Sequence, residues 1–221
     1  MRSLAQPRVL IGASYAAVIT TILCYPRVAM WLERPYATMF LCAMVLWTSF
    51  VLWAFVLAWQ PEYAHRPVFN FACPGWIWTL AAVYGMLGAV TLHLLMDPQL
   101  RVTTPADYPT DWHAWIAMTL FTLAMDPLFL CFAPYAFFMR LLRKPDISLA
   151  LTVMFGLFVQ YLKVNSSRPL PSLSLIVELA VVHIVGGFAS VYFYVKGGVL
   201  PVWAAIFLLE LRHAYDLLAK H

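Results

Sequence analysis

Long apolar runs, separated by short polar segments that carry proline, make up most of the chain. A membrane-spanning helix needs about 20 mostly apolar residues. Seven runs approach or reach that length, over residues 9–25, 36–59, 76–96, 113–142, 147–163, 172–195 and 199–218. The connecting segments 60–75, 97–111 and 164–171 are predicted to be loops. The pattern therefore predicts an all-α, polytopic transmembrane helix bundle with about seven spans.

Proline marks the two irregular runs. The first run is short and is predicted to end at Pro26. The fourth, over 113–142, is too long for one straight span and contains Pro127 and Pro134. Because proline removes a backbone donor and clashes with the carbonyl one turn earlier, we expect this helix to be kinked or broken.

Composition supports a lipid environment and excludes several classes of protein. Of the 221 residues, 63% are hydrophobic and 11% are charged, against roughly a quarter charged in ordinary soluble domains. The net charge of +4 is scattered over loops, which argues against a nucleic-acid partner. The cysteines share no metal-type spacing and are predicted to be free thiols. We expect an integral membrane protein, in the inner membrane if the chain is bacterial, whose partners are membrane lipids and other integral membrane proteins.

Ionisable side chains inside an apolar span are costly and suggest function. Counted from the span ends, three fall near the middle of the membrane: Asp126, His183 and Glu210. Glu210 and His213 are three residues apart and share a helix face, as do His213 and Asp216. Glu178 and His183 are five apart, about 140° around the helix, and do not.

These groups allow three interpretations. A Glu-x-x-His pair on a helix holds metals in helical bundles, but a di-metal site needs two such motifs. We therefore expect no metal, and name Glu210 and His213 as the ligands if a divalent metal binds. A haem or a chlorophyll-type pigment would use one of three histidines: His93, His183 or His213. In the favoured interpretation, interior polar groups satisfy one another: Asp126, His183, Glu210 and Arg212.

The last four runs carry motifs known from one membrane-protein family. Near its C-terminus the chain reads GGFASVYFYVKGGVLPVWAAIFLLELRHAYDLL, which includes Asp216. The fourth run contains APYAFFMRLL, with Arg140, and the fifth contains VMFGLF, with Phe155. These stretches resemble the core of the CPBP family, which includes type II CAAX prenyl endopeptidases and bacteriocin self-immunity proteins. The resemblance implies N-terminal transmembrane helices over 1–111 and a CPBP-like four-helix core over 112–221.

The reactive groups of that family are missing from this chain. Tyr135 and Ala136 stand where the resemblance places two glutamates, and Val159 and Arg212 stand where it places histidines. None of these side chains serves readily as a general base for hydrolysis. The motif remnants are three: Arg140, Phe155 and Asp216. We expect Arg140 and Asp216 to pair across the bundle, and we expect no catalytic residue.

Three functions follow as hypotheses. The first is a non-catalytic protein, either a scaffold or accessory subunit of a respiratory or photosynthetic membrane complex, or a binder of a lipid, prenyl or pigment tail. The second is an active intramembrane hydrolase that uses a displaced set, consisting of Glu178, His183, Glu210 and His213. The third is a membrane subunit that ligates haem or chlorophyll.

Overall fold

The computed structural model describes residues 3–31, 34–64, 66–166 and 171–219, and these ranges are helical between short connections, without a strand. The α-helices are α1 (Pro7–Trp31), α2 (Pro35–Ala64), α3 (Gly75–Thr91), α4 (Asp97–Thr103), α5 (Trp112–Pro127), α6 (Ala133–Leu142), α7 (Pro145–Ser166), α8 (Leu173–Gly197) and α9 (Val199–Leu218). A π-helical turn, Leu92–Met96, joins α3 to α4, and a second, Leu128–Phe132, joins α5 to α6. The predicted all-α bundle is confirmed.

Six of the described helical stretches are long and apolar enough to cross a membrane: 7–31, 35–64, 75–103, 112–142, 145–165 and 173–197. Large apolar side chains point outward along them, including Ile22 (64% exposed), Met39 (70%) and Leu87 (63%). Such a surface is suited to lipid, so the chain is an integral membrane protein. α9 corresponds to the predicted seventh span, but it is not among the six.

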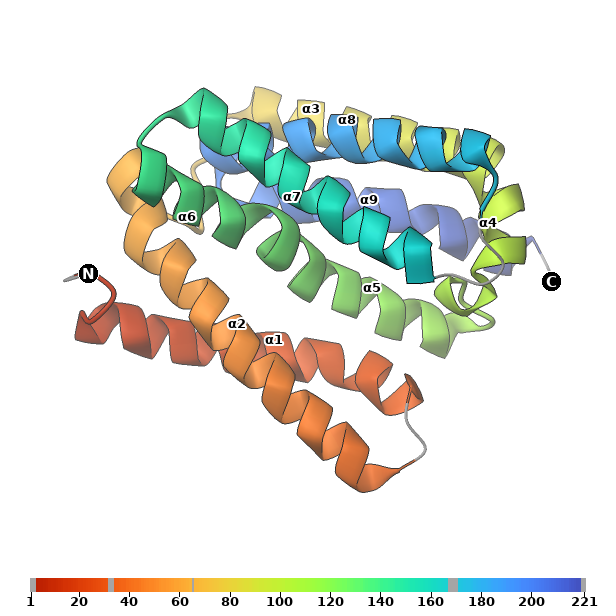
Figure 1. Cartoon of the computed structure of the whole chain (residues 1–221), viewed down its shortest axis with the longest axis horizontal. Helices are drawn as coiled ribbons and strands as arrows, with labels where there is room; N and C mark the ends of the chain where they lie inside the picture. The colour runs from red at the N-terminus through yellow and green to blue at the C-terminus, as the bar shows by residue number, and fades with distance from the viewer. Residues whose placement is uncertain (1–2, 32–33, 65, 167–170, 220–221) are drawn as a thin grey trace.

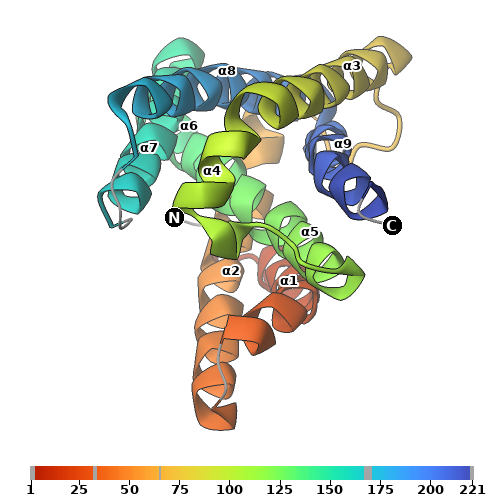
Figure 2. The ribbon, with the colours of Figure 1, turned by 90° about the vertical axis from the view of Figure 1, so that its right-hand side faces the viewer.

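The helices form a bundle with a projecting hairpin. α3 and α8 lie along one side, α1 and α2 along the other, and α5, α6, α7 and α9 lie between them (Figures 1 and 2). α1 packs on α2 and α5, α2 on α6, and α3 on α9. Helices of 1–111 therefore pack directly against helices of 112–221, and the boundary inferred from the family resemblance stays a prediction.

Both π-helical turns precede a proline. Pro98 follows Leu94 by four residues, and Pro134 follows Leu130 by four, so in each case the carbonyl that the proline ring would crowd belongs to the π-helical turn. A wider turn relieves that clash and keeps the helix continuous. The fourth span thus runs from residue 112 to residue 142 with a π-helical turn inside it, so the helix is irregular but not broken.

Several predicted boundaries are wrong, including the end of the fifth run at residue 163, since α7 continues to Ser166. α1 continues past Pro26 to Trp31, because a membrane helix tolerates the loss of one backbone hydrogen bond. α2 continues into the predicted loop 60–75 as far as Ala64. Part of the predicted loop 97–111 is the helix α4, which accepts Pro98 because the first turn of a helix needs no donor there. Residues 167–170 of the predicted loop 164–171 lie outside the described residues.

Candidate functional site

A cavity of about 430 Å³ lies inside the bundle, between α4, α5, α7, α8 and α9. It is called the main cavity below. Most of its wall is apolar, with side chains such as Met96, Leu100, Phe129, Leu130, Leu179 and Val182. Several ionisable side chains also line it: Asp97, Asp107, Asp126, Lys163, His183, Arg212 and His213. The cavity thus combines an apolar interior with polar groups of both signs.

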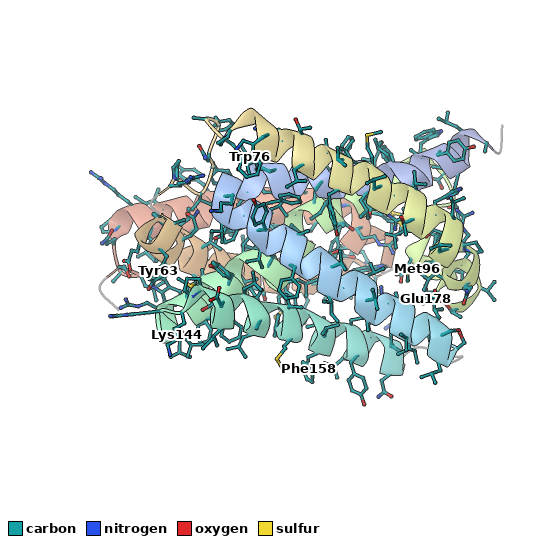
Figure 3. The ribbon with its side chains drawn as sticks, turned by 90° about the horizontal axis from the view of Figure 1, so that it is seen from above. Tyr63, Trp76, Met96, Lys144, Phe158 and Glu178 are labelled. Carbon is teal, nitrogen blue, oxygen red and sulfur yellow. The ribbon has the colours of Figure 1, made fainter. Side chains whose placement is uncertain are left out.

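Next to this cavity lies a group of eight polar side chains, the polar cluster: His93, Asp97, Arg101, Tyr108, Glu210, Arg212, His213 and Asp216. They come from the end of α3–α4, from the segment before α5 and from α9. α4 and the C-terminal end of α9 lie at the same end of the bundle (Figure 1). Figure 3 labels Met96 and Glu178 at this same end, opposite Tyr63 and Lys144.

Helical spacing explains how α4 and α9 present these groups. His93, Asp97 and Arg101 follow one another at intervals of four residues and therefore share one face. On α9, His213 Nε2 lies 3.9 Å from Glu210 Oε2, which confirms that these two residues share a face. The two faces meet, because Arg101 donates to Asp216 Oδ2.

Ion pairs made by Arg212 hold the cluster together. Arg212 Nε lies 3.5 Å from Asp97 Oδ2, and Arg212 Nη1 lies 3.5 Å from Glu210 Oε1. Asp97 is 2% exposed and Glu210 is 8% exposed. Arg212 therefore bridges a carboxylate of α4 and one of α9, which is the arrangement expected of charges removed from water.

The segment before α5 closes one side of the cluster. Tyr108 donates a hydrogen bond of 2.8 Å to Asp97 Oδ1, and its ring packs edge-on against the His213 ring. Burial, followed by the hydrogen bond to Asp97, raises the pKa of the Tyr108 phenol. Arg27 of α1 donates to the Ala106 carbonyl over 2.9 Å and anchors the same segment.

Asp111 begins α5 as its N-cap. Its Oδ1 accepts a 2.8 Å hydrogen bond from the Ala114 N–H. That bond, followed by the one from the Thr110 hydroxyl, lowers the pKa of the Asp111 carboxyl. The cap fixes the point where the segment holding Tyr108 enters the bundle.

The expected mutual satisfaction of interior groups is only partly observed. Arg212 and Glu210 do pair, but the nearest partner of His183 Nδ1 is the Leu179 carbonyl oxygen, 2.9 Å away on the same helix. Since a carbonyl only accepts, Nδ1 carries the hydrogen and Nε2 is left as an acceptor. His183 and Asp126 both line the main cavity.

The displaced hydrolase set does not assemble as a whole. His183 and His213 line the main cavity, whereas Glu178 is half-buried on α8 and is not part of its wall. His93, a predicted pigment ligand, lies with Nδ1 3.5 Å from Asp216 Oδ1. Asp216 of α9 therefore contacts His93 and Arg101, which lie at the end of the helical stretch 75–103.

The expected pair of Arg140 and Asp216 is wrong. Arg140 Nη1 lies 3.9 Å from Glu62 Oε2, because Arg140 is at the end of α6 that packs beside the end of α2. Phe155 contacts the ring of Phe129, with the ring centroids 5.5 Å apart. Each remnant of the family pattern thus has a structural contact.

The four substituted positions of the family pattern fall into two pairs. Val159 and Arg212, where the resemblance places histidines, both line the main cavity. Tyr135 and Ala136, where it places glutamates, line a separate cavity of about 110 Å³ together with Tyr194. The two pairs are therefore not in one site.

Comparison with family models, with curated proteins and with solved structures gives no match. The CPBP resemblance therefore stays a prediction based on the sequence.

Three members of the polar cluster were not predicted as site residues: Asp97, Arg101 and Tyr108. All three fall in the segment 97–111, which the sequence pattern predicts to be a loop. If the predicted helix is extended past Pro98, the four-residue spacing of His93, Asp97 and Arg101 places them on one face. This spacing is the sequence feature that could have indicated the site. No sequence signal placed Tyr108 beside Asp97.

Proposed function

We propose that this integral membrane protein is a non-catalytic binder of one amphipathic, lipid-like molecule, with the acyl or isoprenoid tail held in the main cavity. The observation that carries the proposal is the cavity itself. Its volume of about 430 Å³ lies within the range of roughly 300–1,000 Å³ that is usual for small-molecule sites. Its mostly apolar wall suits a hydrocarbon tail.

The polar lining indicates where the head group binds. His183 Nε2 is an acceptor, Arg212 supplies donors, and Asp126 lies on the same wall. Cationic and acidic groups both occur there, so the lining suits a head group that donates and accepts hydrogen bonds. An alcohol has this chemistry, because a hydroxyl both donates and accepts.

Two wall residues, at the positions where the family resemblance places histidines, supply no general base for hydrolysis, whereas other titratable groups, such as His183 and Asp126, do line the wall. A general base must be a titratable group within reach of the attacked water. Val159 has no such group, and Arg212 is cationic and paired with Glu210 and Asp97.

A filled-cavity variant tests the proposal. Val182→Trp adds an indole to the cavity wall, and Val181→Trp adds the same group to the outer face of α8, where Val181 is 53% exposed. Native mass spectrometry of each detergent-purified protein measures the bound small molecule. We expect one lipid-sized adduct on the wild type and on Val181→Trp, and its loss from Val182→Trp. A bare wild type, or equal adducts on all three proteins, would refute the proposal.

The hypothesis of an accessory subunit in a larger membrane complex rests on the sequence alone and stays a prediction. A stable protein partner that copurifies from the native membrane would support it.

A further inference from the structure

Two carboxylates and one imidazole of the polar cluster direct one atom each toward a common point. His93 Nδ1 lies 3.5 Å from Asp216 Oδ1 and 3.7 Å from Asp97 Oδ2. One ligand atom from each residue lies within 4.8 Å of the other two. Two ligand atoms on one tetrahedral zinc ion are about 3.4 Å apart, given bonds of roughly 2.0–2.2 Å. The three side chains already have nearly the spacing of ligands that share a cation.

The second oxygen of each carboxylate is held by a hydrogen-bond donor. Tyr108 donates to Asp97 Oδ1 over 2.8 Å, and Arg101 donates to Asp216 Oδ2. These bonds leave Asp97 Oδ2 and Asp216 Oδ1 turned toward His93. Donors of this kind orient the ligands in metal sites and account for much of their affinity.

Two of the three converging atoms are buried without a hydrogen bond. Asp97 is 98% buried, and among the described residues its Oδ2 and His93 Nδ1 have no hydrogen-bond partner, although Arg212 Nε forms an ion pair with Asp97 Oδ2 at 3.5 Å. A buried carboxylate oxygen without a hydrogen bond is more costly than a neutral group in the same place. A bound cation would bond directly to both atoms.

The backbone at His93 is also unusual. His93 belongs to the π-helical turn Leu92–Met96, directly before α4. Single π-helical turns inside α-helices occur often at functional sites. Here the turn carries one candidate ligand and leads directly into Asp97, the second.

We propose that His93, Asp97 and Asp216 bind one divalent metal cation, such as Zn²⁺ or Mn²⁺. One imidazole and two carboxylates form a ligand set that suits these ions, and three protein ligands leave a coordination position open. The site differs from the Glu210–His213 pair that the sequence suggested, and it adjoins the main cavity, whose wall includes Asp97.

The surrounding charge permits a cation. Asp97, Glu210 and Asp216 carry three negative charges against two positive charges on Arg101 and Arg212, so with neutral imidazoles the cluster has a net charge of −1. Arg212 opposes the metal, but Glu210 Oε1, 3.5 Å from Arg212 Nη1, offsets part of that charge. Binding of a divalent ion together with one monoanionic ligand from solution brings the net charge of the polar cluster to zero.

A second cavity gives the site room for that outside ligand. It measures about 200 Å³ and is lined by Asp216, Tyr108, His213 and the polar segment around Thr110. That segment lies between the apolar stretches 75–103 and 112–142, so the cavity is near the end of the spans. A cation and its water ligands therefore have an access route from the aqueous side.

Metal titration of the full-length protein, purified in detergent without a polyhistidine tag, tests the proposal. Zn²⁺ binding is followed by calorimetry, and Co²⁺ binding by its visible absorption bands. His93→Ala removes a ligand and Tyr108→Phe removes only the donor to Asp97. His183→Ala is the matched control, because His183 lies outside the cluster on the wall of the main cavity.

We expect one equivalent of metal on the wild type and on His183→Ala, with Co²⁺ bands typical of nitrogen and oxygen ligands. Affinity should fall at least tenfold in Tyr108→Phe and further in His93→Ala. Tyr108→Phe retains all three ligands, so it remains informative if His93→Ala does not fold. A wild type that binds no metal, or unchanged affinity in both cluster variants, overturns the proposal and leaves an ion-pair cluster without a metal. The lipid-sized adduct on the wild type is measured separately, so the two proposals fail independently.

Discussion

The Tyr108 hydroxyl donates a 2.8 Å hydrogen bond to Asp97 Oδ1, so the segment before α5 is joined to the first residue of α4. Asp97 is 2% exposed, and Tyr108 supplies the hydrogen bond to one of its two oxygens. The same contact sets the orientation of a proposed metal ligand. It therefore links the stability of the fold to the candidate site.

Replacing Tyr108 by phenylalanine should destabilise the protein. The ring is retained, but Asp97 Oδ1 loses its donor in a buried place, which costs about 1–3 kcal/mol. Unfolding of the metal-free protein in detergent measures the loss. Tyr161→Phe is the control, because Tyr161 is 62% exposed on α7. Equal stability losses in the two variants would contradict the role given to Tyr108.

The stabilisation by Tyr108 should decline in strong alkali. Burial and the bond to Asp97 raise the pKa of Tyr108 in the folded protein, whereas an unfolded tyrosine titrates near pH 10. The contribution is therefore complete below about pH 10, and it is lost as the pH rises from there toward the folded pKa. We expect the stability advantage of the wild type over Tyr108→Phe to be smaller at pH 11 than at pH 8. An advantage that does not change with pH would refute this.

The N-cap Asp111 should stabilise the protein at neutral pH and lose this effect in acid. Its carboxylate accepts the Ala114 N–H, and its pKa is lowered, so the contribution is present above the unfolded value of about 3.9 and is lost as the pH falls through the folded value. Asp111→Ala should lower the melting temperature by roughly 2–4 °C at pH 7. Asp111→Asn keeps a cap without a charge, and its melting temperature should be less sensitive to acid.

Gly85 should be required for the close packing of α3 on α9. A methyl group at this position would lie 2.5 Å from the Ala205 carbonyl oxygen and 2.9 Å from Leu208 Cβ. Gly85→Ala should therefore cost about 1–3 kcal/mol. The matched change Gly156→Ala on α7 meets no atom within 4 Å and should be neutral or stabilising by up to about 1 kcal/mol. Unfolding midpoints of the two variants compare these effects directly.

The helices could be predicted from the sequence because lipid requires an uninterrupted apolar run. Their ends were harder to predict. Pro26 lies inside α1, and Pro98 lies in the first turn of α4, since a helix in an apolar setting tolerates one missing donor better than a broken backbone. The irregular fourth span was predictable because Pro127 and Pro134 lie within a run that exceeds one membrane thickness.

The candidate site was only partly predictable. The shared face of Glu210 and His213 follows from helix geometry, and the structure confirms it at 3.9 Å. The contact between His93 and Asp216 depends on the packing of α3 against α9. No local sequence pattern specifies which helices become neighbours in the tertiary structure. Asp97 was missed because a charged residue before a proline is more typical of a loop than of a buried helix start.

The charge on α9 has a consequence for how the chain is made. α9 carries Glu210, Arg212 and Asp216, and it is not among the described helices that are apolar enough to enter lipid unaided. Its partners on α4, Asp97 and Arg101, leave the ribosome earlier. We therefore expect α9 to integrate only beside an already inserted α3–α4, and the same segment on its own to pass through the translocon instead of being retained.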